Sequence, residues 1–240
     1  MLSRASALLV PAFGRLHITT AAADDATDAT NGTGAANATD AGRPAPGSIV
    51  AANHTSLADP AVVLAALHRL GARPVVLATA GLWRVPVLGP VLRREGYIAV
   101  HRGTARAAES LDAAAEALAA GRVVLIYGEG GLPRRRDSGE LPPGPFRSGL
   151  ARLARATGAP VVPLGQAGAR RLTSGGPLKQ LAGLATAPVR RPALHVHLGS
   201  PLHLPPDTAE ATARVHHAVT AAWKVAAGRA EREAGERRPT

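Results

Sequence analysis

Short apolar runs alternate with longer segments of helical periodicity along most of the chain. Runs of this length that contain few polar residues are typical of strands buried on both faces of a sheet. The predicted strands are 48–53, 74–79, 97–100, 123–127, 161–164 and 194–198. Helices are predicted at 60–70, 105–119, 146–157 and 208–236, with a short helix or turn at 86–94. This alternation predicts a single α/β domain with a largely parallel, mixed sheet flanked by helices.

The first 47 residues depart from this pattern. Residues 5–13 form an apolar run that Pro11 interrupts, so they imitate a signal peptide only weakly, and a short membrane-touching helix fits equally well. Residues 21–46 carry almost no large apolar side chain and are predicted to be a loop or linker. We therefore predict a partly disordered or membrane-proximal N-terminal segment, a folded domain and a C-terminal helix, over residues 1–47, 48–205 and 206–240.

The amino-acid composition excludes several kinds of functional site. Among the 240 residues only 2% are aromatic, so the core must consist of Ala, Leu and Val. The sequence has no cysteine, which excludes disulfides, thiolate metal ligands and a cysteine nucleophile. It also has no apolar run of about 18 residues, the length needed to span a bilayer.

Positive charge is concentrated in the middle of the chain. The net charge is +11, and residues 69–191 hold 19 Lys and Arg against 7 Asp and Glu. Such a field favours anionic partners, namely phosphorylated substrates, acidic lipid headgroups or nucleic acid. Nucleic acid is disfavoured because aromatic side chains for base stacking are scarce, so we expect no nucleic-acid partner.

Residues 53–60, Asn-His-Thr-Ser-Leu-Ala-Asp-Pro, follow the first predicted strand of the domain. On one continuous helix, His54 and Asp59 would point about 140° apart, so they can meet only across a turn. Pro60 supports such a turn, because proline disfavours helical torsions at Asp59 and suits the first position of a helix. An imidazole beside a carboxylate at a strand exit indicates a general base and the group that orients it.

Structural roles also fit these residues. Asp59 before Pro60 is an ordinary helix N-cap, and Ser56 with Asp59 has the spacing of a capping box. A lone histidine such as His54 is more often structural than catalytic. Other stretches of the sequence must decide between these alternatives.

Three further stretches lie at the ends of predicted strands, where sheets of this type bind ligands. Residues 96–102 bring His101 and Arg102 to one strand end, and Tyr127-Gly-Glu-Gly-Gly131 brings Glu129 to the next. The third stretch, 158–164, is a strand bracketed by prolines. Taken alone, Arg102 fits a solvated charge and the glycines fit a flexible turn. The glycine turn also lacks the Lys-Ser/Thr pair of a Walker phosphate loop.

His195 and His197 share one face of a predicted strand and so suggest a metal site. Zinc, a metal that histidines commonly bind, is held by at least three ligand side chains. No third ligand is recognisable in the sequence, so we expect no bound metal and no other resident cofactor.

Taken in order, these stretches resemble the glycerophospholipid acyltransferase family typified by 1-acylglycerol-3-phosphate acyltransferase. The family's first motif, Asn-His-x-Ser-x-x-Asp, is matched at 53–59, and its second, a Gly before an apolar strand and an Arg, at Gly96 and Arg102. The third, usually Phe-Pro-Glu-Gly-Thr-Arg, is matched only in part, since Gly131 and Leu132 stand where Thr and Arg are usual. Later blocks are matched at 144–149 and 161–163, so that the resemblance covers about 48–164 and extends toward 198.

The resemblance implies a glycerol-phosphate acyltransferase-like fold and an O-acyltransferase in which His54 is the general base and Asp59 orients it. The acyl group would pass from acyl-CoA or acyl-carrier protein to the free hydroxyl of a lysophospholipid, with 1-acylglycerol-3-phosphate as the expected acceptor. No covalent enzyme intermediate is needed. We assign substrate contacts to Asn53, Ser56, Arg102, Glu129, Gly130 and Gly131, and a substitute for the missing third-motif arginine to Arg134, Arg135 or Arg136.

The expected partner surface is an anionic membrane, on which the basic middle of the chain would dock. This predicts a cytoplasmic enzyme associated peripherally with the inner face of the cell membrane. Two alternatives stay open. One is an acyltransferase for an aminolipid or glycolipid acceptor, which the altered third motif favours. The other is a non-enzymatic basic module that binds lipid or nucleic acid, with the His-Asp pair as a relic or a cap.

Overall fold

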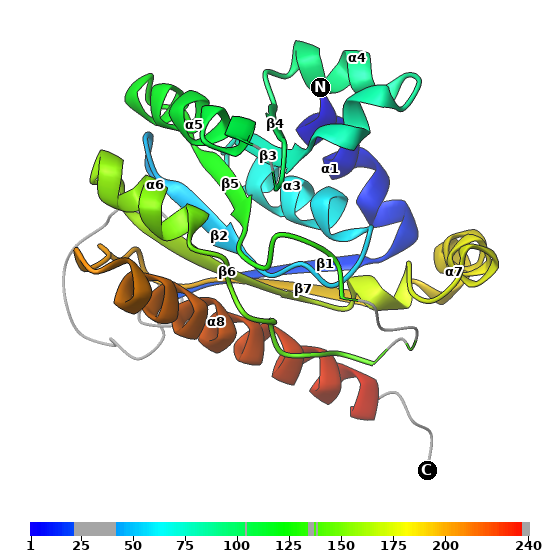
Figure 1. The fold of residues 1–240 in the computed structure, drawn as a ribbon. Coiled ribbons are helices and arrows are strands. Elements are labelled where there is room, and N and C mark those ends of the chain that lie inside the picture. The colour runs from blue at the N-terminus through cyan, green and yellow to red at the C-terminus, as the bar shows by residue number, and fades with distance from the viewer. Residues whose placement is uncertain (22–41, 104, 134–136, 138, 237–240) are drawn as a thin grey trace, which may run out of the picture.

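Figure 1 shows a computed structural model of the chain, which describes residues 1–21, 42–103, 105–133, 137 and 139–236. Within these residues, seven strands form one sheet in the order β1-β7-β6-β2-β5-β3-β4. The strands are β1 (Arg15–Thr20), β2 (Ile49–Ala52), β3 (Val75–Thr79), β4 (Ile98–Val100), β5 (Val124–Tyr127), β6 (Val161–Ala167) and β7 (Ala193–Leu198). The strands from β6 to β4 are mutually parallel, whereas β7 is antiparallel to β6 and β1 is parallel to β7. The predicted α/β class with a largely parallel, mixed sheet is confirmed.

Helices cover both faces of this sheet (Figure 1). The α-helices are α1 (Leu2–Phe13), α3 (Asp59–Arg69), α4 (Leu88–Arg94), α5 (Glu109–Ala119), α6 (Gly149–Thr157), α7 (Pro177–Arg190) and α8 (Thr208–Glu236). Short 3-10 turns are η1 (Ala80–Arg84), η2 (Ala105–Ala107) and η3 (Ala169–Arg171). Alternate residues of β2 enter opposite cores: Val50 and Ala52 join the core beneath α3, and Ile49 and Ala51 join the core beneath α5, α6 and α8. Aliphatic side chains fill both cores, as the scarcity of aromatic residues predicts.

Residues 2–20 are part of this sheet and its core, although the sequence analysis places them in a separate N-terminal segment. β1 pairs with β7 over all six of its residues, and α1 packs against α3 with Val10 buried between them. β1 alternates polar and apolar residues at the edge of the sheet, so it carries only a weak strand signal. Residues 22–41, which form most of the predicted loop, lie outside the described part of the chain.

Several predicted helix boundaries shift in the structure. The helix predicted at 105–119 is the short turn η2 followed by α5, and the one predicted at 146–157 begins only at Gly149. The latter starts late because Arg147 donates its backbone N–H to the Gly128 carbonyl at 2.9 Å, which holds this part of the chain against the glycine turn. The terminal helix predicted at 208–236 coincides with α8. α7 was not predicted.

α8 lies directly on the central strand β6. A Cβ atom on Gly165 of β6 would come within 2.0 Å of the Trp223 backbone nitrogen, so only glycine permits this approach. The contact fixes α8 across one face of the sheet. Among the described helices, none has the length and apolar character needed to cross a membrane.

Candidate active site

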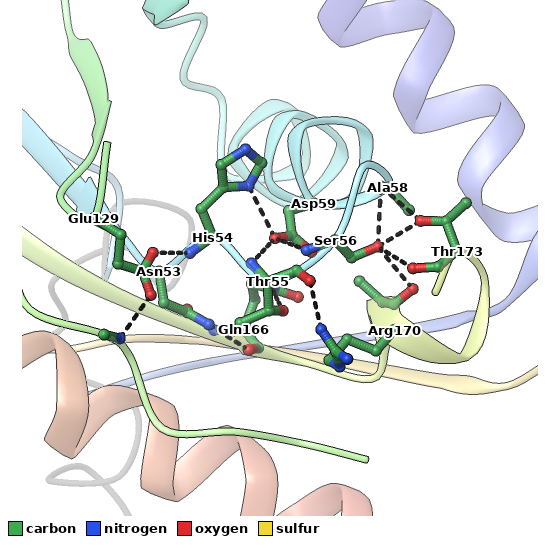
Figure 2. A network of polar contacts seen from close by, with 12 residues as sticks. Asn53, His54, Thr55, Ser56, Ala58, Asp59, Glu129, Gln166, Arg170 and Thr173 are labelled. Carbon is green, nitrogen blue, oxygen red and sulfur yellow. Dashed lines mark hydrogen bonds and ion pairs between the residues drawn. The ribbon is translucent and has the colours of Figure 1, made fainter. Parts of the chain in front are cut away.

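His54 and Asp59 meet at the end of β2, as their spacing predicts (Figure 2). His54 follows the strand, and Asp59 is the first residue of α3. The His54 Nδ1 atom lies 3.1 Å from the Asp59 Oδ2 atom. The Asp59 side chain is fully buried, whereas the His54 side chain keeps 16% of its surface exposed. A buried carboxylate therefore holds an imidazole that solvent can still reach.

The hydrogen bonds of Asp59 define the tautomer of His54. Asp59 Oδ2 also accepts the backbone N–H groups of Thr55 and Ser56, at 2.5 and 2.8 Å. An oxygen that faces two N–H donors acts as an acceptor toward the third group as well, so Nδ1 of His54 carries the proton. The Nε2 atom of His54 then keeps its lone pair and is able to take a proton from a substrate.

Asp59 combines an orienting role with a local structural one. The N-cap of α3 is Ala58, and the carboxylate of Asp59 binds backbone N–H groups that precede the helix. Its bond to the Ser56 N–H is one half of the predicted capping box. The other half is missing, because the Ser56 hydroxyl accepts from the Ala58 N–H at 3.1 Å. The capping and orienting alternatives therefore coexist in one carboxylate.

Tyr127, the last residue of β5, forms one wall of the site. Its ring stacks on the His54 ring with centroids 4.4 Å apart and planes inclined by 30°. Burial, and next the nearby Asp59 carboxylate, raise the pKa of the Tyr127 hydroxyl well above its usual value. The phenol is therefore neutral, and it fixes the plane of the imidazole without adding charge. Sequence analysis did not assign Tyr127 a role.

The side chains of Asn53 and Ser56 have protein partners (Figure 2). Asn53 is fully buried and clasps the backbone of Gln166: its amide accepts the Gln166 N–H at 2.8 Å and donates to the Gln166 carbonyl at 3.1 Å. The Ser56 hydroxyl lies 2.5 Å from the Thr173 hydroxyl and donates to the Ala169 or Thr173 carbonyl. These contacts favour a positioning role for both residues, and the substrate contacts that the sequence analysis assigns them stay a prediction.

Arg170 holds the turn that follows β2 in place through its contact with Thr55. Its side chain is only 2% exposed, and its guanidinium donates to the Thr55, Gly139 and Asp137 carbonyls at 2.5 to 2.8 Å. A buried guanidinium is stable only with such a set of acceptors. The sequence analysis did not single out Arg170, because its partners are backbone atoms that only the fold brings together.

Glu129 connects the catalytic turn to the glycine-rich turn. Its carboxylate accepts the backbone N–H of His54 at 2.5 Å and that of Gly144 at 3.0 Å. Burial raises its pKa from 4.5 to about 7, although the two N–H bonds oppose that shift. Glu129 thus positions His54, and the substrate contact that the sequence analysis assigns to Glu129 stays a prediction.

This raised pKa predicts a pH-dependent stability. Between pH 4.5 and about 7 the folded state binds more protons than the unfolded state, so stability contributed by Glu129 is present at low pH and is lost as the pH rises. The loss would approach about 3 kcal/mol at most. We expect Glu129→Gln to flatten the fall in unfolding free energy between pH 5 and 7.5, measured by urea unfolding.

Glu116, an exposed carboxylate on α5, offers the matched control for this experiment. Glu116→Gln should leave the slope with pH unchanged. Burial also raises the pKa of Glu140, so part of the slope should persist in Glu129→Gln. A slope as steep as that of the wild type would contradict the assignment to Glu129.

Two arginines gather at the glycine turn. A Cβ on Gly130 would lie 2.9 Å from the Arg147 side chain, and one on Gly131 would lie 3.5 Å from an Arg102 nitrogen. Burial, and next the charge of Arg147, lower the pKa of Arg102. Neither arginine forms an ion pair with a carboxylate among the described residues. Two like charges that lie close together without a carboxylate favour an anionic ligand between them.

Arg147 takes the place near the glycine turn for which the sequence analysis nominated Arg134, Arg135 or Arg136. Those three residues lie outside the described ranges, so that prediction stays a prediction. Arg147 belongs to the block 144–149, which was recognised from its sequence but given no role. Its closeness to Arg102 depends on the bond from the Arg147 N–H to Gly128, which a sequence pattern does not reveal.

A separate cluster of His17, His195 and Glu233 lies between β1, β7 and α8. Glu233 Oε2 is 3.1 Å from His195 Nε2 and 3.5 Å from His17 Nε2. Of the two histidines noted in the sequence, only His195 belongs to this cluster, because the His197 ring bonds to the Thr19 hydroxyl instead. The other oxygen of Glu233 accepts from Arg15 at 2.8 Å. Arg229 lines the same cavity. Arg15 and Arg229 already compensate the negative charge of Glu233. The cluster is therefore better suited to hold α8 on the sheet than to bind a dication.

The site therefore presents a carboxylate-oriented base and a pair of arginines at the end of a parallel sheet, an arrangement able to deprotonate a hydroxyl near a bound anion. The sequence model of the Acyltransferase family matches residues 35–166, more than half of the chain. The chain belongs to the Acyltransferase family and is an acyltransferase. This membership favours the enzyme over the non-enzymatic module.

The chain is similar over its whole length to a solved structure of an acyltransferase. That structure is the 1-acyl-sn-glycerophosphate (LPA) acyltransferase, PlsC, from Thermotoga maritima, which is 18% identical in sequence with a TM-score of 0.62. The match covers 100% of this chain and 80% of that chain. At this identity the likeness shows a shared fold. A search of curated proteins found no match.

Proposed function

We propose that the protein transfers a fatty acyl group from acyl-CoA or acyl-carrier protein to the free hydroxyl of a lysophospholipid, with 1-acylglycerol-3-phosphate as the acceptor and phosphatidic acid as the product. The observation that carries this proposal is the His54–Asp59 pair, in which the bond to Asp59 uses Nδ1 of His54 and leaves Nε2 as the base, together with the two arginines at the glycine turn. The acceptor's chemistry requires both features, because it has a hydroxyl to deprotonate and a phosphate to bind.

The reaction follows from the hydrogen bonds of His54. The lone pair of Nε2 takes the proton of the acceptor hydroxyl as that oxygen attacks the thioester carbonyl. Asp59 stabilises the imidazolium that forms, through the bond to Nδ1. When the carbon–sulfur bond breaks, the imidazolium returns the proton to the departing thiolate, so that ester and free thiol leave a regenerated enzyme. Ser56 is not a nucleophile in this scheme, because its hydroxyl is buried among protein partners.

The phosphate of the acceptor would bind between Arg102 and Arg147. Guanidinium groups pair with phosphate oxygens through charge-assisted hydrogen bonds, which are about twice as strong as neutral ones. Gly130 leaves room for Arg147, since a Cβ there would lie 2.9 Å from that side chain, whereas a Cβ on Gly131 would make only an ordinary van der Waals contact with Arg102 at 3.5 Å. Gly130 would thus act by admitting Arg147 to the site.

The acidic donor and an anionic membrane fit the charge of the chain. Residues 69–191 carry a net charge of +12, which attracts both the phosphates of acyl-CoA or acyl-carrier protein and acidic lipid headgroups. We accordingly include in the proposal a peripheral location at the inner face of the cell membrane, without a resident cofactor.

The test is an assay of the purified protein with a labelled acyl-CoA or acyl-carrier protein and lysophosphatidic acid. Labelled phosphatidic acid is the expected product. If the protein transferred no acyl group to lysophosphatidic acid or to any member of a panel of lyso-lipids, the proposal would be wrong.

A second acceptor class is favoured by one observation. Gly131 and Leu132 replace the Thr and Arg that are usual in the third motif. An aminolipid or glycolipid acceptor needs no phosphate contact from that position. Transfer to such a lyso-lipid at a higher kcat/KM than to lysophosphatidic acid would select this alternative.

A further inference from the structure

Helix α7 exposes an apolar surface that nothing in the described structure covers. Only Ala187 of its 14 residues is buried. Leu178, Leu181 and Val189 are 81%, 65% and 89% exposed, although helices with so few polar residues are normally buried. Figure 1 shows α7 standing out at one end of the molecule, beside α1. Such a helix requires a partner of apolar character.

α1 continues this surface. It packs beside α7, and the Arg191 guanidinium at the end of α7 donates to the Pro11 carbonyl of α1 at 3.2 Å. Leu8 and Leu9 of α1 are 79% and 59% exposed. Exposed apolar side chains on two adjacent helices differ from the singly scattered ones that need no explanation on a protein surface.

The charges of the two helices identify the partner. Neither helix contains Asp or Glu, whereas α7 carries Lys179 and Arg190 and α1 carries Arg4. Exposed leucines among basic residues without acidic ones are typical of helices that lie in the interface of an anionic bilayer. A helix surface that binds another protein would more often carry charges of both signs.

The surface is linked directly to the catalytic turn. The segment that leads into α7 contains Thr173, whose hydroxyl accepts the Ala58 N–H at 3.1 Å and bonds to Ser56. Leu57, which lies between Ser56 and Ala58 in the sequence, is 61% exposed. A bilayer that receives α7 would therefore lie close to the opening of the site.

We propose that α7, together with the exposed leucines of α1, is the surface by which the protein docks on anionic lipid bilayers, so that the catalytic turn faces its lipid substrate. This inference rests on the proposed function for its purpose, since an acceptor of this class resides in the bilayer. The binding itself is measured without turnover, which keeps the two proposals separable.

The first measurement is flotation with vesicles of phosphatidylcholine and phosphatidylglycerol, compared with vesicles of phosphatidylcholine alone. We expect the Leu178→Gln/Leu181→Gln variant to lose at least about tenfold in partition onto the anionic vesicles, because two inserted side chains are removed. Val225→Gln, which changes an exposed residue of α8 on the opposite face, should bind as the wild type does. Arg4→Gln/Lys179→Gln should weaken binding only where anionic lipid is present.

The second measurement is transfer to two forms of the same acceptor. The leucine variant should lose activity toward an acceptor embedded in vesicles and keep it toward a short-chain acceptor in solution. Wild-type protein that acts on the soluble acceptor but does not float with vesicles would overturn the docking surface alone. Lost flotation in the variant without transfer to any acceptor would uphold the surface and overturn the proposed reaction.

Two other outcomes would also overturn the docking surface. One is equal flotation of the wild type and the leucine variant, which would place the membrane contact elsewhere. The other is a wild-type dimer in analytical ultracentrifugation that the leucine changes dissociate, which would assign the patch to a second copy of the chain.

Discussion

Replacing His54 with alanine should lower kcat for acyl transfer by about 10² to 10⁴, the usual contribution of a general base. We assign the proton transfer to the Nε2 lone pair of His54 alone, so the variant lacks the base of the proposed reaction. The ring also stacks on Tyr127, and its loss leaves a partly open space at the surface of the site. Rates and circular dichroism should be measured on the same preparation, and the spectrum should match that of the wild type.

His203 provides the control, since it is an exposed histidine far along the chain. His203→Ala should retain wild-type kcat. If His54→Ala kept more than about a tenth of the wild-type kcat, the general-base assignment would be wrong, because a lost base costs at least about a hundredfold.

Asp59→Asn separates the orienting role from the structural one. An asparagine oxygen is able to accept the Thr55 and Ser56 N–H groups, and Asn serves helix N-termini about as well as Asp. The variant should therefore fold, yet it stabilises the imidazolium poorly and should lose most of its turnover. An unfolded variant, or one with full activity, would contradict the role given to Asp59.

The second large effect concerns the arginine pair. Arg102→Gln and Arg147→Gln should each lower kcat/KM for lysophosphatidic acid by about 10- to 100-fold, since a hydrogen bond to a charged group contributes about 1.5 to 3 kcal/mol. The loss should fall mainly on KM, because the phosphate is bound both before and during the reaction. Steady-state kinetics with lysophosphatidic acid and with a phosphate-free monoacylglycerol would measure it.

Arg152, an exposed arginine of α6, is the matched control for charge alone. Arg152→Gln should change neither substrate's kinetics by more than about twofold, since an exposed charge is screened by salt. Equal losses for the phosphorylated and the phosphate-free acceptor in Arg147→Gln would show that Arg147 shapes the turn without binding phosphate.

The meeting of His54 and Asp59 was predictable because the information lies within six neighbouring residues. The proline after Asp59 and the strand before His54 leave only a turn to join them. The sheet class was predictable for the same reason, since each buried strand is a local apolar run. α8 was located correctly because its helical pattern is long and ends in polar residues.

The supports of the site were not predictable because they depend on contacts between distant segments. Arg170 donates to backbone carbonyls of two loops, and no pattern of residue types marks that use. Glu129 was recognised, but its bonds to the His54 and Gly144 N–H groups give it a positioning role. β1 was missed because its partner β7 lies at the other end of the chain.

The clasp between Asn53 and Gln166 sets the order in which the enzyme becomes competent during synthesis. Asn53 must wait for a partner 113 residues further along the chain, and Ser56 for Thr173. Contacts of such long sequence separation form late in folding, because the intervening loop must first close. Before β6 and the segment after it have been synthesised, the turn at His54 is not yet held in place. Acyl transfer should therefore begin only once about three quarters of the polypeptide has folded.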